Sequence, residues 1–541
     1  MTTRNFKSYL DDGRALVDAR IAKTEDSESL RAMREKRNTY SCAVRIPPEV
    51  LTLIFLDVVD DIYESGRKPI QQLYLPHVCR YCQKYWRYQP LYRGGQLRSL
   101  HLIERAEGRP LYLFGRFPAD NSSYACCVSQ DRDQVLSQAE YVKVTLDSDF
   151  LSSDTDDPID IDIPQFLQAF FEGGAPNLKS LTLSADVVNW VIIPEEAFGS
   201  NFPCLRSLTL EHVECSWLTP IFVSSLTHLI LLGPLYFDET CTQTLQRLPS
   251  LRYLDLATLL YQDHPGTSAP IPPFEIPNDP PSVKLEHLEV LRVRGEGSLL
   301  GDLALELTIP LSASITLVSL CPEDPMGNSL HQCLDLKPLI YWLSRRLEEL
   351  DQGSTPIHTM HIEFGFNPDG DDQNGVLRLH HSPDSIIDPV QLPKAEYPRS
   401  HLKIEFCLHQ RETLLMAIPK LQLSTVQVLY LDDVHPFDVE TALGGLIGVQ
   451  TLCLRGQDLT HMLQNLAPTR SRREALLPAL RTLVLREADF EEEFSHVLSF
   501  LAKRCPPVEK VYLSQCEYVE EEYLQAMLQH VSTVEWDEFD L

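Results

Sequence analysis

The sequence predicts an α/β protein in which a small all-helical block precedes a long array of parallel strands, with helices and loops between the strands. Three observations support this prediction. The chain has 541 residues, which exceeds the ~100 to 200 residues of one ordinary domain and favours several modules or a repeat array. Residues 41–93 carry apolar side chains at helical spacing. An aliphatic motif recurs along residues 94–541.

The recurring motif is Pro-x-Leu-[Lys/Arg]-x-Leu-x-Leu. It occurs four times, at residues 176–183, 203–210, 249–256 and 478–485. The composition of the chain predicts about 0.05 matches by chance, so the four copies are a genuine repeat. Looser copies that keep the aliphatic triplet lie at residues 226–231, 288–293, 426–431, 449–454 and 508–513.

The spacing of the copies indicates the architecture. The first aliphatic residues at positions 178, 205, 226 and 251 are 27, 21 and 25 residues apart, and those at 426, 449, 480 and 508 are 23, 31 and 28 apart. These intervals are close to the ~20 to 29 residue period of leucine-rich repeats. Residues 94–541 are therefore predicted to form an irregular leucine-rich-repeat solenoid. Parallel strands would line its concave side, and loops and helices such as 239–248 and 521–528 would lie outside.

Along each strand, the leucines are predicted to point inward and the alternate residues outward. The last copy is followed by Cys516, whose thiol is expected to be buried in the turn after the strand. The outward positions of a solenoid line the face where such proteins bind partners. They are Ser180, Thr182, Ser207, Thr209, His228, Ile230, Tyr253, Asp255, Val290, Arg292, Val428, Tyr430, Thr482, Val484, Lys510 and Tyr512. Interface energy concentrates in tyrosine and arginine anchors, so four of these residues are the predicted target-binding residues: Tyr253, Arg292, Tyr430 and Tyr512.

Two segments interrupt the array. Residues 261–283 contain seven prolines, which exclude a helix or a central strand. They are interpreted as a surface loop, with a docking peptide as the alternative. Residues 321–400 mix Pro, Gly, Asp and His, and isolated strands are predicted there at 357–362 and 376–379.

The composition limits the classes of binding partner and the cellular compartments that we expect for this chain. Lys and Arg number 47 against 77 Asp and Glu, a net charge of −30, so nucleic acid and anionic membranes are poor partners. No apolar run reaches the ~20 residues that a bilayer span needs. Residues 1–21 are too charged for a secretory signal, and residues 1–40 are predicted to form an exposed helix. The 14 cysteines are irregularly spaced, which favours buried thiols in the cytoplasm or nucleus.

The signatures of common enzymes do not occur in the sequence, so we expect no catalytic residue, metal or cofactor. Cys79 and Cys82 have CxxC spacing without a second pair, which favours packed thiols over a metal site. The acidic run 153–162 lacks the glycine and final glutamate of a calcium loop, so it is interpreted as a solvated loop. A separate hypothesis places an enzyme in residues 300–420, near acidic residues 369–372. Its histidines are interpreted instead as solvated loop residues: His358, His361, His380 and His381.

Residues 41–93 resemble an F-box domain. Residues 46–51 read Ile-Pro-Pro-Glu-Val-Leu and are followed by Ile54 and Phe55, which is similar to the Leu-Pro-Pro-Glu-Ile-Leu…Ile-Phe opening of that family. Residues 76–80, Pro-His-Val-Cys-Arg, resemble its Ser-His-Val-Cys-Arg signature. The family's tryptophan three places after this cysteine is Cys82 here, and Trp86 follows four residues later. Residues 104–113 and 194–210 are similar to the regions that follow the F-box in large fungal F-box and leucine-rich-repeat proteins.

This resemblance implies a substrate receptor. The F-box of the family docks on the Skp-type adaptor of a cullin ubiquitin ligase, and the repeats hold a target protein. The residues that the resemblance assigns to adaptor binding are Ile46, Pro47, Pro48, Glu49, Val50, Leu51, Ile54, Phe55, Val78 and Cys79. An alternative is a leucine-rich-repeat scaffold that does not engage the ligase.

Overall fold

The computed structural model divides the chain into two compact units. Unit 1 comprises residues 1–186 and 199–204, and unit 2 comprises residues 187–198 and 205–541. The structure describes residues 19, 29, 88–90, 110–118, 136–147, 171, 174–185, 191–193, 195–198, 202–233, 239–258, 283–320, 336–353, 356–364, 374–381, 401–407, 410–432, 442–455, 459–467 and 475–537. The predicted F-box residues 46–79, the acidic run 153–162 and the proline-rich segment up to 282 lie outside these ranges. Of the predicted N-terminal helix, only Ala19 and Ser29 are described.

The described residues of unit 1 contain four parallel strands in sequence order: β1 (Tyr88–Pro90), β2 (Leu111–Pro118), β3 (Ala139–Asp147) and β4 (Ser180–Ala185). Strand β1 lies at the end of residues 41–93, so the prediction that this block is all-helical is wrong at that end. Alternate residues of β3 and β4 are buried, among them Val142, Val144, Leu181 and Leu183. This alternation is what a strand with one buried face requires.

Unit 2 is built on a long sheet whose described strands are parallel with one exception. Its first strands pair in the order β6 (Ser207–Glu211), β8 (His228–Gly233), β9 (Tyr253–Thr258), β11 (Val290–Gly295) and β13 (Ser314–Ser319). Its last strands pair in the order β17 (Val428–Asp432), β18 (Thr451–Arg455), β19 (Thr482–Arg486), β20 (Lys510–Ser514) and β21 (Thr533–Trp536). Two short parallel pairs lie beside the sheet, β5 (Val191–Ile193) with β7 (Val213–Cys215) and β10 (Val283–Lys284) with β12 (Leu307–Thr308). The fold is therefore mixed α/β with a mostly parallel sheet, as the sequence predicted.

Each full copy of the motif contains one strand, and the predicted inward orientation of its leucines is confirmed. The second and third leucines of every full copy lie within a strand and are buried; Leu181, Leu208 and Leu254 are 0% exposed. The first leucine closes a turn, because Leu251 N–H donates to the Leu248 carbonyl at 3.2 Å and Leu480 N–H to that of Leu477 at 3.0 Å. The motif proline is the second residue of this turn, where its fixed φ is favourable.

The basic residue of the motif lies just before the strand, and in three of the four full copies it forms an ion pair with a glutamate of a neighbouring repeat. Lys179 pairs with Glu140 at 2.6 Å, and Arg252 pairs with Glu289 at 3.3 Å. Both pairs are largely solvated, so each contributes about 0 to 1 kcal/mol and serves mainly to match neighbouring repeats.

The segment between β13 and β17 inverts the strand order. The strands here lie in the order β13, β16 (Leu402–Cys407), β15 (Asn374–His380), β14 (Thr359–Phe364) and β17. Strand β15 is antiparallel to both of its neighbours. The strands predicted at 357–362 and 376–379 are thus confirmed as β14 and β15, although they are paired within the main sheet and not isolated.

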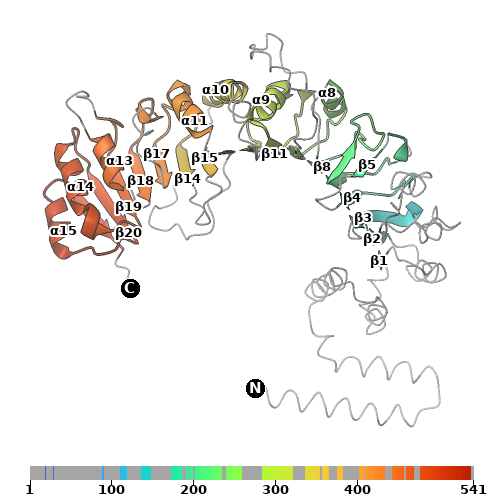
Figure 1. Cartoon of the computed structure of the whole chain (residues 1–541), viewed down its shortest axis with the longest axis horizontal. Coiled ribbons are helices and arrows are strands. Elements are labelled where there is room, and N and C mark those ends of the chain that lie inside the picture. Colours follow the sequence, from blue (N-terminus) through green and yellow to red (C-terminus); the bar gives the residue numbers. More distant parts are fainter. Residues whose placement is uncertain are drawn as a thin grey trace, which may run out of the picture. The chain divides into compact units, whose positions relative to one another are not determined.

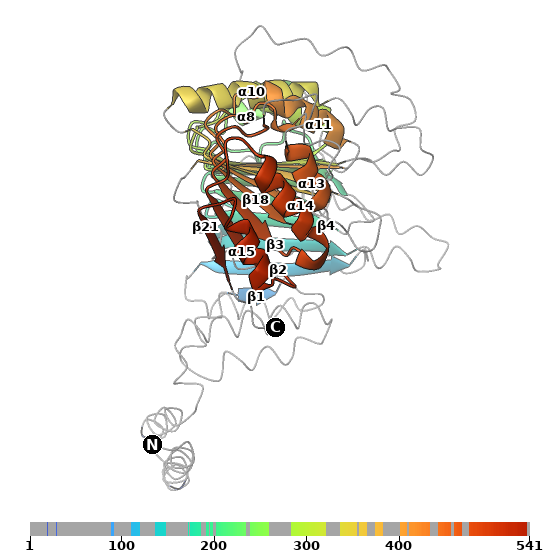
Figure 2. The ribbon, with the colours of Figure 1, turned by 90° about the vertical axis from the view of Figure 1, so that its left-hand side faces the viewer.

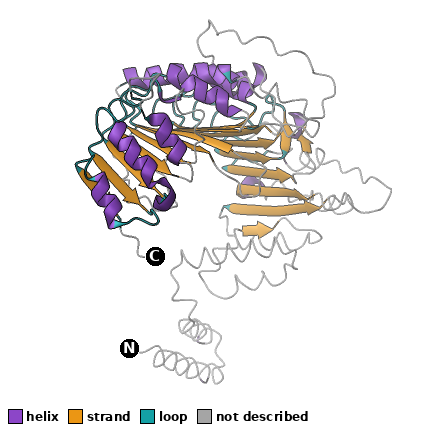
Figure 3. Ribbon diagram, turned by 60° about the vertical axis from the view of Figure 1, so that its left-hand side comes forward, coloured by secondary structure: helices purple, strands orange, loops and turns teal. Residues whose placement is uncertain are grey.

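The helices of unit 2 lie against one face of its sheet (Figures 1 and 3). They are α8 (Glu239–Gln246), α9 (Gly297–Glu306), α10 (Lys337–Gln352), α11 (Arg411–Ala417), α13 (Leu459–Leu466), α14 (Phe490–Lys503) and α15 (Glu521–Met527), with 3-10 turns at Glu195–Ala197 and Ile418–Lys420. The predicted helices at 239–248 and 521–528 are α8 and α15. Figure 2 shows α13, α14 and α15 side by side at the C-terminal end of unit 2. Among the described helices, none has the length and apolar character needed to cross a membrane.

Helices α9 and α10 pack directly against each other. They approach so closely at Gly301 that a Cβ atom there would overlap Pro338 Cβ and the Leu339 nitrogen. The predicted burial of Cys516 is confirmed, since its thiol lies in the turn after β20 and donates to the Leu485 carbonyl at 3.4 Å.

Candidate functional site

The residues that alternate with the buried leucines lie on the face of the unit 2 sheet away from the helices, which we call the opposite face. Burial divides this face into two zones. On β6, β8, β9, β11 and β13 its side chains are mostly exposed or half-buried, and we call this part the open zone. On β14, β17, β18 and β19 the corresponding side chains are mostly buried, and we call this part the closed zone. Its buried members include Thr359, His361, Val428, Tyr430, Asp432, Cys453 and Val484.

Three aligned side chains form the centre of the open zone. The rings of His228 on β8 and Tyr253 on β9 are stacked, with centroids 5.9 Å apart and an interplanar angle of 20°. On the adjacent strand β11, the Arg292 guanidinium carbon lies 5.7 Å from the centroid of the Tyr253 ring. His228 and Arg292 are exposed, whereas Tyr253 is half-buried between them. We call these three residues the Tyr253 platform.

The buried carboxylate of Asp255 fixes the position of the Tyr253 ring. Asp255 is 3% exposed, and it accepts a hydrogen bond from the Tyr253 hydroxyl at 3.3 Å. The same carboxylate pairs with Arg294 at 3.3 Å. Burial and the Asp255 charge raise the pKa of Tyr253, so the phenol stays protonated and keeps donating. Asp255 therefore fixes the ring while its own charge is neutralised by Arg294.

The closed zone contains a continuous chain of polar side chains. His361 on β14 is 1% exposed; its Nε2 lies 3.1 Å from Asp432 Oδ2 on β17, and its Nδ1 lies 2.9 Å from Arg378 Nη1 on β15. Because a guanidinium nitrogen only donates, Nδ1 must accept, so Nε2 carries the proton and donates to Asp432. Arg378 also donates to Glu363 on β14. His361 is therefore a neutral bridge between a cation and a carboxylate.

The chain continues to β19 through Arg455. Its Nη1 lies 3.9 Å from Asp432, and its Nε donates to Glu487 at 2.9 Å. Glu487 follows β19 directly and has a φ of 53°, a left-handed conformation that is uncommon for a residue with a side chain. Six polar side chains thus link segments from β14 to the end of β19: Glu363, Arg378, His361, Asp432, Arg455 and Glu487.

An apolar cluster lies beside this chain. It contains Val428, Tyr430, Cys453 and Val484, with Tyr512 packed against it. Burial is the largest cause of the raised pKa of the Cys453 thiol, which is therefore protonated. The Lys510 ammonium lies 4.1 Å from the centroid of the Tyr512 ring. Tyr430 and Tyr512 are thus engaged within unit 2.

The structure separates the four predicted target-binding residues. Tyr253 and Arg292 come together in the open zone, as expected for outward positions. The expectation that Tyr430 faces outward into solvent is wrong, because its side chain is only 6% exposed. Val428, Val484 and Asp255 were predicted outward and are also buried, since neighbouring side chains of the same face cover them. The sequence reasoning did not select His228 or Asp255, although their register beside Tyr253 and Arg292 was the available signal.

The interpretation of the histidines of residues 300–420 as solvated loop residues is wrong for His361 and His380, whereas His358 and His381 lie just outside β14 and β15 and are half-buried. His361 and His380 lie in strands and are buried. Burial lowers the pKa of His380 to about 4 and that of His401 to about 3, with neighbouring histidines adding to the effect. Among the described residues, no group of three or more His, Cys, Asp or Glu side chains could hold a metal ion.

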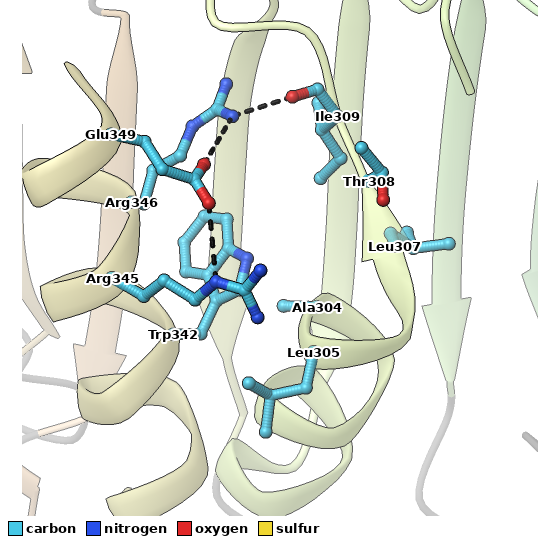
Figure 4. Close-up of a pocket in the computed structure, with 9 residues that line it drawn as sticks. All are labelled: Ala304, Leu305, Leu307, Thr308, Ile309, Trp342, Arg345, Arg346 and Glu349. Carbon is cyan, nitrogen blue, oxygen red and sulfur yellow. Dashed lines mark hydrogen bonds and ion pairs between the residues drawn. The ribbon is translucent and has the colours of Figure 1, made fainter. Parts of the chain in front are cut away.

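A small cavity lies on the helix side of unit 2, between α9, β12 and α10 (Figure 4). Its volume is about 50 Å³, which suits a few water molecules at about 10 to 15 Å³ each. Arg346 is buried at its wall, donates to the carbonyls of Ile309 and Pro310, and lies 3.8 Å from Glu349. The arginine thereby ties α10 to the segment after β12, which is a structural role.

The ten predicted adaptor-binding residues, from Ile46 to Cys79, lie outside the described residues, so their role stays a prediction. No model of a known protein family matches the sequence, and no curated protein is significantly similar to it. The open zone with the Tyr253 platform is the surface of the described residues that best suits a partner, because it combines exposure, aromatic area and charge.

Proposed function

We propose that this chain is the target-recognition subunit of a Skp-cullin-F-box ubiquitin ligase. In this proposal residues 41–93 form the F-box and bind the Skp-type adaptor, and the unit 2 array is a leucine-rich-repeat solenoid that binds a target protein. The ligase chemistry belongs to other chains, so the protein itself is not an enzyme and needs no cofactor. It would act in the cytoplasm or nucleus.

The observation that carries the proposal is the open zone, a sheet face on which Tyr253 and Arg292 are presented by parallel strands in register. Repeat arrays bind partners through such surfaces, and a few tyrosine and arginine anchors supply most of the energy of protein interfaces. The net charge of −30 supports a protein partner over nucleic acid or an anionic membrane. The F-box resemblance of residues 46–80 supports the link to the ligase.

The second candidate is a repeat scaffold that does not engage the ligase. It is favoured by one feature of the sequence, Cys82 at the position where the F-box family has a tryptophan. Both candidates share the target-binding face, so adaptor binding decides between them.

The deciding experiment mixes the purified full chain with a purified Skp-type adaptor and measures complex formation by size-exclusion chromatography. The wild-type chain should form a complex, and a Pro47→Glu, Ile54→Glu double variant should not. Ile192→Glu is the matched control, because Ile192 is an apolar residue of unit 2 that is 64% exposed. A wild-type chain that forms no complex would support the scaffold instead. A complex that both substitutions leave unchanged would show that the adaptor binds elsewhere on the chain, which contradicts the F-box assignment.

A further inference from the structure

We propose that the open zone binds an extended acidic segment of the target, whose Asp or Glu carboxylate pairs with Arg292 while an adjacent apolar or aromatic side chain packs beside Tyr253, against Ile230 and Val290. This inference rests on the proposed function and names the class of target segment that its binding face fits. It follows from the distribution of charge, the order of the platform and the apolar residues around it.

Arg292 is the exposed cation of the open zone that has no carboxylate partner among the described residues. Three neighbouring basic side chains are neutralised within the chain. The ion pairs are Arg252 with Glu289, Arg294 with Asp255, and Lys403 with Glu405. The Arg292 guanidinium instead lies against the Tyr253 ring, which occupies its face and leaves its edge of N–H donors for a ligand. Paired N–H groups of a guanidinium match the two oxygens of a carboxylate.

The platform is ordered before any ligand arrives. Tyr253 is held by the stacked His228 ring on one side and by its hydrogen bond to Asp255. A side chain that is already fixed loses less entropy on binding, so more of the contact energy appears as affinity. Ile230 and Val290 are half-buried on the strands that flank β9. They provide apolar area for the residue next to the acidic one.

A single carboxylate fits the site better than a phosphate group. A phosphate carries about −1.5 to −2 charges and is bound best by a cluster of cations, whereas Arg294 is already held by Asp255. The net charge of −30 does little to repel an acidic segment, because physiological salt largely screens forces between exposed charges more than about 8 Å apart. At contact distance the unpaired Arg292 therefore decides which charge is favoured.

The test selects random decapeptides displayed on phage against the purified full chain, in wild-type, Arg292→Gln and Arg252→Gln forms. Arg252 is the matched control, since it is an exposed arginine already paired with Glu289. Wild type and Arg252→Gln should enrich peptides in which Asp or Glu adjoins an aromatic or aliphatic residue. A synthetic copy of the best peptide should bind Arg292→Gln about tenfold more weakly by fluorescence anisotropy, as expected for loss of a charge-assisted contact. Arg292→Lys should fall between the two because it keeps the charge and loses the fork geometry.

Enrichment of basic or uncharged peptides overturns the inference, as does a selection that enriches nothing. Equal affinity for wild type and Arg292→Gln overturns it as well. Tighter, Arg292-dependent binding of a phosphoserine peptide without Asp or Glu would reassign the ligand to phosphate. Adaptor binding is measured on the same preparations. A wild-type chain that shows no acidic preference but still binds the adaptor refutes this inference alone, whereas a wild-type chain that does not bind the adaptor refutes the proposed function.

Discussion

Replacing Leu254 by alanine should destabilise unit 2 by about 2 to 5 kcal/mol. Leu254 is 0% exposed on β9, and the strand register places it between Leu229 of β8 and Leu291 of β11. The substitution removes roughly three methylene-sized groups at about 0.8 kcal/mol each, and the cavity between the flanking leucines adds to that loss.

Urea unfolding followed by circular dichroism measures this change as a lower midpoint. The control is Thr209→Ala on β6, a half-buried residue of the opposite face, which should change the unfolding free energy by no more than about 0.5 kcal/mol. If both variants lose the same stability, the inward and outward assignments of the strands are wrong, and the reasoning from the motif to the register fails.

Asp432→Ala should cost about 1 to 3 kcal/mol because it leaves the Nε2–H of buried His361 without its acceptor, whereas Arg252→Ala at a solvated pair should cost less than about 1 kcal/mol; urea midpoints of both variants compare them. The pKa of His380 is about 4 in the folded chain and about 6.5 when unfolded. The unfolded state therefore binds a proton first as the pH falls, and His380 contributes stability that is lost between about pH 6.5 and pH 4, up to about 3 kcal/mol. A pH series of melts should show this slope, and His380→Gln should reduce it. Asp489 accepts a hydrogen bond from Glu491 N at 2.9 Å at the start of α14, so Asp489→Ala should lower stability by about 1 kcal/mol; an unchanged thermal melt would exclude this capping role.

The motif copies were sufficient to predict strands and register because each one combines a turn with an alternating aliphatic run. A proline and a leucine at fixed spacing close the turn, and the two following leucines must share one buried face. The predictions for Leu181, Leu208 and Leu254 needed no information from other parts of the chain, which is why they are confirmed.

The inversion of β14, β15 and β16 could not be predicted in the same way. Alternating residues such as Leu377 and Leu379 have the same period of two whichever direction the strand runs. Strand direction here depends on which segments pair, and those pairs join residues far apart in sequence, such as His361 with Tyr430. The polar chain through His361 and Asp432 arises from that pairing, as does the closed zone that buries Tyr430. Two residues of the Tyr253 platform, Tyr253 and Arg292, were predicted. This was possible because they lie on neighbouring repeats with regular spacing.

The proposed division of labour between residues 41–93 and the open zone is tested most directly by quantitative affinity purification and mass spectrometry. Three forms of the full chain are compared, the wild type, Pro47→Glu with Ile54→Glu, and Tyr253→Ala with Arg292→Ala, each with a thermal melt to confirm folding. A Skp-type adaptor and a cullin should be captured by the wild type and lost only from the first double variant. A separate target protein should be lost only from the second. Absence of the adaptor and cullin from the wild-type sample, or loss of adaptor and target together from either folded variant, would contradict the account.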